Sequence, residues 1–207
     1  MGYPYLDDIV QQQKSEDCSI KSDAVLIAPS WHEGNIFESC IVPLAHSLLM
    51  SGFRVIARPH DELLKRQQKL ISDISRHFEN KGLFTLETNL GNVKSIQSAA
   101  LLIADWGGIV FEWAFAKERP AMLINTNMKV RNKSYLDLGI APMEILAREH
   151  LGKNVALEDM KNAGEYARDL LKNKEAYVKK IRDFRKRMIY NFGNSAEVGA
   201  RYILSLL

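Results

Sequence analysis

The stretch "LLIADWGGIVFEWAFAKERPAML", residues 101–123, runs from a buried-strand pattern through an acid and two glycines into an apolar helix pattern. Glycines between a strand and a helix let a ligand approach the backbone closely, because they have no side chains. The first amides of a helix are unpaired and carry partial positive charge. We therefore interpret Gly107 and Gly108 as a candidate phosphate site, and a tight turn without a ligand as the alternative.

Strand-length apolar runs alternate with helix-length amphipathic stretches around this segment. Uninterrupted apolar strands are typical of strands buried on both faces, and the alternation indicates right-handed βαβ units. We therefore predict an α/β fold with a Rossmann-like parallel sheet flanked by helices, followed by C-terminal helices. Strands are expected at 24–30, 53–60, 83–88, 100–105 and 120–125, with one more short strand considered at 154–159. Helices are expected at 37–52, 61–82, 92–99, 109–118, 163–191 and 195–207.

Composition limits the class of protein. The 207 residues carry a formal net charge of +3, with 46% hydrophobic and 26% charged residues, which is ordinary for a globular domain. This charge is too small to predict a nucleic-acid partner. Cys18 and Cys40 form no CxxC motif, which argues against a disulfide framework or a zinc site. We predict no cofactor and assign no metal ligand.

No apolar run reaches the roughly 18 residues of a membrane span, and the N-terminus lacks a signal-peptide pattern. We therefore expect a cytoplasmic protein, with peripheral contact to the inner face of the cell membrane left open. A basic run at 172–187 is either a solvated helix face or a contact for an anionic membrane surface. The segment 125–142 has no clear period and is either a functional loop or a plain crossover.

Polar clusters follow three of the expected strands: "SWHEGN" at 30–35, "RPHDE" at 58–62 and "DWGG" at 105–108. In an open parallel sheet, ligands bind beyond the carboxyl ends of the strands. We therefore expect the three clusters to meet at one edge of the sheet. The sequence has no GxSxG, P-loop, HExxH or GxGxxG motif, so hydrolase-type, kinase-type and zinc-peptidase functions lack support.

Arg58 and His60 flank Pro59, which stiffens the turn. An arginine and an imidazole here could bind a diphosphate through charge-assisted hydrogen bonds. His60 could instead act as a general base, or lie exposed at a helix start with no such role. Asp105 fits a capping acid.

Trp31 and Glu112 are further candidates for the donor site. Trp31, with the other tryptophans, could equally be a packing residue. Glu112 lies one turn into the helix at 109–118, where it could reach a ribose hydroxyl or simply face water.

The ordered set of motifs resembles the C-terminal half of the CDP-glycerol glycerophosphotransferase family, the teichoic-acid-type transferases. The resemblance covers most of residues 2–140. The matching segments are Gly2-Tyr3-Pro4 with Asp7, Pro29-Ser30-Trp31, Arg58-Pro59-His60, Asp105-Trp106-Gly107-Gly108, Phe111-Glu112 and Arg119-Pro120.

This resemblance implies one half of a GT-B architecture that binds a nucleotide-diphosphate donor, with CDP-glycerol favoured. It implies His60 as the catalytic candidate. The donor or phosphate set is Arg58, Asp105, Gly107, Gly108, Trp31 and Glu112. Residues 1–22 would be an interdomain-like segment, and 23–207 the donor-binding domain with a helical tail. The chain would then be a fragment of a longer enzyme, inactive without an N-terminal acceptor domain.

Two departures from the family pattern leave alternatives open. Both family serines are replaced by Gly107 and Gly108, and the arginine that follows the family tryptophan is His32 here. The glycine pair also resembles sugar-nucleotide GT-B glycosyltransferases and UDP-N-acetylglucosamine 2-epimerases. A non-catalytic nucleotide-binding or interaction module is the third alternative.

Overall fold

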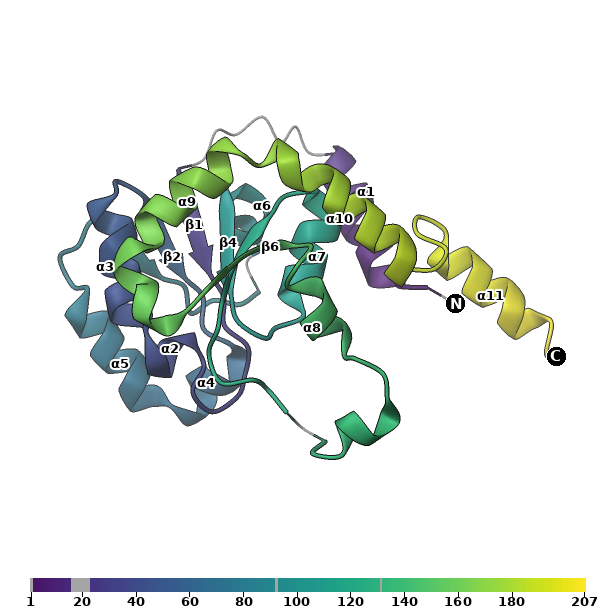
Figure 1. The fold of residues 1–207 in the computed structure, drawn as a ribbon, viewed down its shortest axis with the longest axis horizontal. Helices are drawn as coiled ribbons and strands as arrows, with labels where there is room; N and C mark the ends of the chain where they lie inside the picture. The colour runs from purple at the N-terminus through teal and green to yellow at the C-terminus, as the bar shows by residue number, and fades with distance from the viewer. Residues whose placement is uncertain (1, 16–22, 92, 131) are drawn as a thin grey trace.

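In the computed structural model, which describes residues 2–15, 23–91, 93–130 and 132–207, six parallel strands form one sheet in the order β3-β2-β1-β4-β5-β6. Helices pack on both sides of this sheet (Figure 1). The predicted Rossmann-like α/β fold is confirmed. The strands are β1 (Ala24–Ile27), β2 (Arg54–Ala57), β3 (Phe84–Leu86), β4 (Leu101–Ala104), β5 (Ala121–Ile124) and β6 (Gly152–Val155).

Side chains of β1 and β4 alternate between two buried faces. Leu101 and Ile103 belong to one core, and Leu102 and Ala104 belong to the other. Because successive side chains of a strand point to opposite sides, a strand buried on both faces needs apolar residues at every position. This is why the run at 101–104 shows no polar alternation.

Each face has its own helices. The first core is covered by α2 (Ile36–Ser39), α3 (Ile41–Met50), α4 (Asp61–Arg66), α5 (Gln68–His77) and α9 (Ala163–Lys172), with a 3-10 turn η2 (Leu157–Asn162). The second is covered by α1 (Pro4–Ser15), α6 (Lys94–Ser98), α7 (Ile109–Lys117), α8 (Met143–Ala147) and α10 (Glu175–Met188).

Three predicted helices are each divided in two. The helix expected at 37–52 breaks at Cys40, three residues before Pro43. A proline inside a helix removes a hydrogen bond, whereas in the first turn its missing N–H costs nothing. The break therefore places Pro43 in the first turn of α3. The other two breaks fall at Gln67, between α4 and α5, and at residues 173–174, between α9 and α10. No proline near either position predicts the break from the sequence.

Asp7 on helix α1 links that helix to the start of helix α11 (Ser195–Leu204) through hydrogen bonds. The Asp7 carboxylate is 5% exposed and accepts hydrogen bonds from the amides of Gly193 at 2.7 Å and Ser195 at 2.8 Å. The Tyr3 amide in turn donates to Ser195 Oγ at 3.0 Å. Residues 1 and 16–22, with Cys18, lie outside the described part, so the domain boundary at 22–23 stays a prediction.

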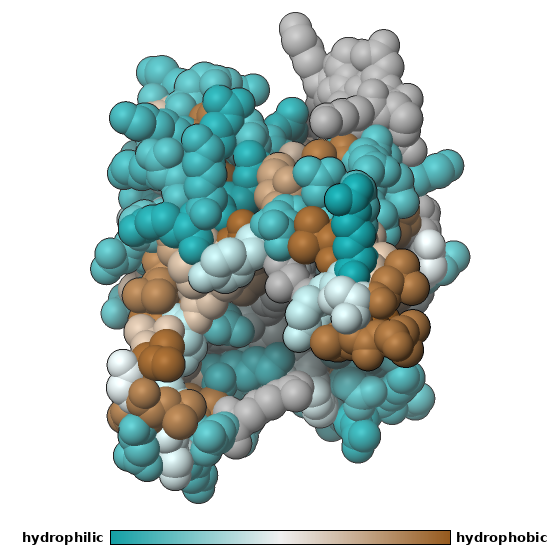
Figure 2. All heavy atoms as spheres, turned by 90° about the vertical axis from the view of Figure 1, so that its right-hand side faces the viewer, coloured by the Kyte–Doolittle hydropathy of each residue, from teal (hydrophilic) through white to brown (hydrophobic). Residues whose placement is uncertain are grey.

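Beyond this junction, α11 projects away from the sheet (Figure 1). Figure 2 looks at the side from which it projects and shows apolar clusters separated by hydrophilic side chains. The exposed apolar residues of the C-terminus are Val198, Tyr202, Ile203, Leu204, Leu206 and Leu207. Within the described ranges, no helix combines the length and the apolar character needed to cross a membrane.

Asp7 yields a stability prediction. Burial alone would raise the pKa of its carboxyl, but the hydrogen bonds from Gly193 and Ser195 outweigh burial and lower it. Such a group contributes stability above its unfolded pKa of about 3.9, and this contribution is lost as the pH falls through the folded value. Asp7→Asn should lower the free energy of unfolding by about 1–3 kcal/mol at pH 7.

The difference between Asp7→Asn and wild type should begin to shrink as the pH falls below about 3.9, where the carboxyl of the unfolded chain takes up a proton, and should continue to shrink until the pH passes the lower pKa of the folded carboxyl. Urea unfolding at pH 7 and pH 3 measures both values. The exposed neighbour Asp8, changed to Asn, is the matched control and should stay within about 0.5 kcal/mol of wild type. Equal losses in the two variants would contradict the role given to Asp7.

Candidate anion-binding site

Asp105, directly after β4, organises the carboxyl edge of the sheet. Its carboxylate is buried and accepts the amides of Ser30 and Trp106 at 2.7 Å each and the amide of Ile36 at 3.2 Å. Ser30 and Ile36 lie in and after the loop that follows β1, so one side chain holds that loop beside the turn after β4. Asp105 acts as a capping acid and is not among the residues that line the cleft described next.

The three predicted clusters meet in one cleft of about 300 Å³ at this edge. Ser30 comes from the loop after β1, and Arg58 and His60 come from the turn after β2. Gly107 and Gly108 complete the floor from the turn between β4 and α7. The predicted convergence of the strand-end turns is therefore confirmed.

The space available for a side chain differs between Gly107 and Gly108. A Cβ on Gly107 would lie 3.3 Å from the Cβ of Ser30, so the tight packing of the turn favours glycine there. A Cβ on Gly108 would meet nothing within 4 Å, and its backbone, with φ −63° and ψ −23°, suits any residue. Within the described part of the chain, no group accepts a hydrogen bond from either amide. The turn thus leaves open space and two donors at the start of α7.

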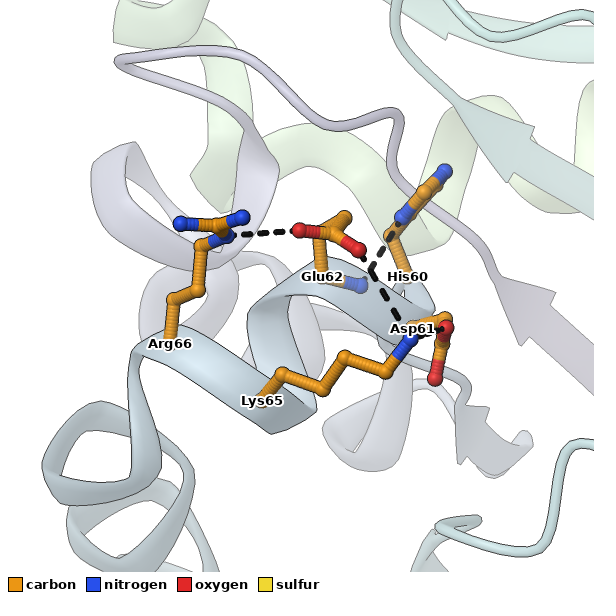
Figure 3. Close-up of polar contacts among 5 residues, drawn as sticks. All are labelled: His60, Asp61, Glu62, Lys65 and Arg66. Carbon is orange, nitrogen blue, oxygen red and sulfur yellow. Dashed lines mark hydrogen bonds and ion pairs between the residues drawn. The ribbon is translucent and has the colours of Figure 1, made fainter.

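His60 caps α4. Its Nδ1 accepts the amide of Glu62 at 3.2 Å, and the outer edge of the ring points away from the helix (Figure 3). In a neutral imidazole, an accepting Nδ1 places the proton on Nε2. Burial, followed by the positive charge of Lys129, lowers the pKa of His60, which keeps the ring neutral at pH 7. His60 lines the cleft, and its Nε2–H is not used in capping α4.

Arg58 is largely committed to neighbours in the protein. Its guanidinium forms an ion pair with Glu87 at 2.7 Å and donates to the carbonyl of Leu90 at 2.7 Å, with 11% of the side chain exposed. Ser95 donates to the same Glu87 carboxylate. Arg58 thus joins the end of β2 to the loop after β3, and its positive charge is partly balanced at the wall of the cleft.

Lys129 is a lining residue of the cleft that the sequence analysis did not single out. It comes from the aperiodic segment at 125–142, which includes the 3-10 helix η1 (Tyr135–Leu138) and extends below the sheet in Figure 1. The length of that loop was the only available signal. Lys129 adds a cation to the lining of the cleft.

Two predicted site residues lie elsewhere. Trp31 packs against the core on the α3 side and does not line the cleft. Glu112, half-buried on α7, accepts a hydrogen bond from the Tyr3 hydroxyl at 2.8 Å. Burial raises the pKa of Glu112, and the Tyr3 hydrogen bond partly offsets it. His32, within the loop after β1, forms hydrogen bonds with Ser30 Oγ at 2.8 Å and Thr126 Oγ1 at 3.3 Å.

A buried arginine, Arg148, supports the same edge from below. It is 8% exposed and donates to the Asp105 carbonyl at 3.1 Å, the Ile124 carbonyl at 3.0 Å and Asn125 Oδ1 at 2.7 Å. These partners follow or end β4 and β5. Burial lowers the pKa of Arg148 to about 10, and the negative charge of Asp105 opposes this shift, so the guanidinium stays charged at pH 7.

The basic run at 172–187 is only partly available to a partner. Arg182 and Arg185 both pair with Glu118, and Arg185 also donates to the carbonyl of Phe115. Lys179, Lys180 and Lys186 are exposed on α10. In the described ranges, no three metal-ligating side chains lie together.

Asp105 can be tested without a ligand. Asp105→Asn turns one acceptor into an NH₂ donor that faces backbone N–H groups, so the free energy of unfolding should fall by about 1–3 kcal/mol. Hydrogen exchange of the Ser30 amide should accelerate beyond the global change. The exposed Asp73→Asn is the control. An Asp105→Asn protein with wild-type stability and unchanged Ser30 exchange would show that Asp105 does not organise this edge.

Comparison with solved structures gives the same architecture. A structure of the wall teichoic acid polymerase TagF matches with a TM-score of 0.60 and 18% identity over 99% of this chain and 50% of that chain. A histidine-to-asparagine variant of TagF soaked with CDPG for 15 minutes gives a TM-score of 0.56 and 19% identity, over 99% and 49% of the two chains. Acinetobacter baumannii MurG matches more weakly, with a TM-score of 0.45 and 14% identity over 91% of this chain and 51% of that chain.

No protein-family model and no curated protein sequence matches the chain. The chain spans about half the length of the TagF structures. The predicted likeness to teichoic-acid-type transferases is thus confirmed for the fold: this chain has the Rossmann-like α/β fold of about half of the TagF chain.

Proposed function

We propose that this chain is the donor-binding domain of a CDP-glycerol-type glycerophosphotransferase, with an acceptor domain supplied by further sequence. One observation supports the proposal: Gly107, Gly108, His60 and Lys129 line one cleft, and within the described part of the chain neither glycine amide has a hydrogen-bond acceptor. Donors and a cation at a helix start favour an anionic phosphate group. The likeness to TagF, including a structure soaked with CDPG, supports the class of donor.

In the proposed reaction, an acceptor hydroxyl attacks the glycerol-bearing phosphorus. A new O–P bond forms, the bond to the CMP oxygen breaks, and the hydroxyl proton passes to a base. Catalysis of this kind rests largely on positioning and charge stabilisation. The diphosphate would be bound by the amides of Gly107 and Gly108, by Lys129 and by His60. Arg58 would stabilise the wall of the cleft through its ion pair with Glu87.

His60 is the candidate for direct contact with the reacting phosphate. Its Nδ1 is occupied by the Glu62 amide, so the contacting atom would be the Nε2–H donor. This arrangement favours phosphate binding over the general-base role. Without an acceptor domain, the chain should bind the donor and not turn it over.

A sugar-nucleotide transferase or 2-epimerase is the second candidate, since Gly107 and Gly108 supply backbone amides and no hydroxyls. Calorimetric titration with CDP-glycerol, CDP and UDP-N-acetylglucosamine separates the two. Tighter binding of CDP-glycerol supports the first proposal, and tighter binding of the uridine nucleotide supports the second. Absence of binding by all three would favour a non-catalytic module.

His60→Asn gives a sharp test, because asparagine is a good helix cap but lacks the Nε2–H group. The variant should keep the wild-type melting temperature and bind CDP-glycerol about 10- to 100-fold more weakly, the loss expected for a hydrogen bond to a charged group. His77→Asn, on the exposed side of α5, is the matched control and should bind as wild type does.

Undiminished affinity in a folded His60→Asn protein would remove His60 from the site.

A cytoplasmic location and contact with an anionic membrane surface also stay proposals. Lys179, Lys180 and Lys186 are the exposed cations on α10 that support a membrane contact, each contributing about 1 kcal/mol near an anionic surface. Flotation with vesicles that contain phosphatidylglycerol, compared with purely zwitterionic vesicles, tests it.

A further inference from the structure

A second cleft of about 460 Å³ adjoins the anion cleft and shares Gly108 and Lys129 with it. Its other lining residues include Trp106, from the turn after β4, and Tyr135, from η1. Glu144, on α8, also lines this cleft. A ligand whose phosphate lies over the Gly108 amide could therefore continue into this cleft without leaving the surface of the protein.

Trp106 is a preformed wall of the second cleft. Its Nε1–H donates to the Thr126 carbonyl at 3.1 Å, and the Arg148 guanidinium lies 4.2 Å from the ring centroid. Arg148 is itself held by Asp105, Ile124 and Asn125. An indole fixed at one edge and stacked on a buried cation loses little conformational freedom when a ligand packs against it.

The polar groups limit the ligand's charge. Lys129 and Glu144 both line this cleft, so their opposite charges offset each other and a second anionic group gains no net attraction there, whereas hydroxyl or amino groups would find an acceptor in the Glu144 carboxylate. Aromatic and apolar walls with a few polar groups are typical of sites for small organic molecules. The second cleft therefore suits an uncharged, hydrogen-bonding organic group.

We propose that the cleft beside Trp106 binds the uncharged organic group that is esterified to the diphosphate, with Trp106 as its contact wall and Arg148 as the residue that positions Trp106. The inference rests on the proposed function, because the phosphate must lie in the adjoining cleft. Two parts of the donor fit this description, the nucleoside and the transferred alcohol. Both are uncharged and carry hydroxyl or amino groups that can donate hydrogen bonds.

The test compares three probes: inorganic pyrophosphate, CDP and CDP-glycerol. Trp106→Leu should weaken the organic esters about 10-fold or more and leave pyrophosphate within 2-fold, with Trp106→Phe restoring most of the affinity. Equal weakening of CDP and CDP-glycerol would assign the cleft to the nucleoside. Weakening of CDP-glycerol alone would assign it to the glycerol.

A second variant keeps the proposal testable if Trp106→Leu does not fold. Glu144→Gln should weaken the same ester by about 3- to 10-fold and leave pyrophosphate unchanged, while Glu149→Gln, on the exposed end of the same segment, should have no effect.

Folded variants that bind every probe as wild type does, or that lose pyrophosphate equally, would overturn the inference and leave the proposed function standing. A wild-type protein that binds none of the three probes would overturn the proposed function itself.

Discussion

The carboxylate of Asp105 is the constraint on which the carboxyl edge depends. Three backbone amides, two of them far away in sequence, converge on one buried side chain. Without an acceptor there, the loop after β1 would have to bury unpaired N–H groups, each costing about 1–3 kcal/mol. Arg148 supplies a buried positive charge on the other side of the same turn. The cleft above Gly107 and Gly108 is therefore shaped by interactions that do not touch a ligand.

At the carboxyl edge of the sheet, some polar side chains hold the loops in place and others are left to contact a ligand. The sequence predicts Arg58 as an anion ligand. In the structure, its guanidinium pairs with the Glu87 carboxylate and donates to the Leu90 carbonyl. His60 caps a helix with one nitrogen and leaves the other for the cleft. The amides of Gly107 and Gly108 and the Nε2–H of His60 have no hydrogen-bond acceptor within the described part of the chain, and Lys129 adds a cation to the lining of the cleft. In the proposed site, a phosphate would be bound by backbone and imidazole dipoles more than by a free guanidinium, because Glu87 already pairs with Arg58.

The sequence predicted the sheet and the meeting of three turns, because apolar runs mark buried strands and parallel strands share one carboxyl edge. The sequence could not predict which polar side chains would form hydrogen bonds or ion pairs within the protein. Glu112 turns to Tyr3, a pairing between residues 109 positions apart that no local pattern indicates. Lys129 and Arg148 lay in or after an aperiodic segment, where neither strand nor helix spacing fixes a direction. The break of the helix at Cys40, by contrast, follows from Pro43 and was available from the sequence.

Backbone NMR of ¹⁵N-labelled protein titrated with inorganic pyrophosphate tests the central claim most directly. If the strand-end turns form one anion site, the amide resonances of Gly107 and Gly108 and the Nε2 resonance of His60 should shift together, with one dissociation constant. Saturable shifts confined to α10 or to the loop after β3, with the glycine amides and His60 unmoved, would contradict the account.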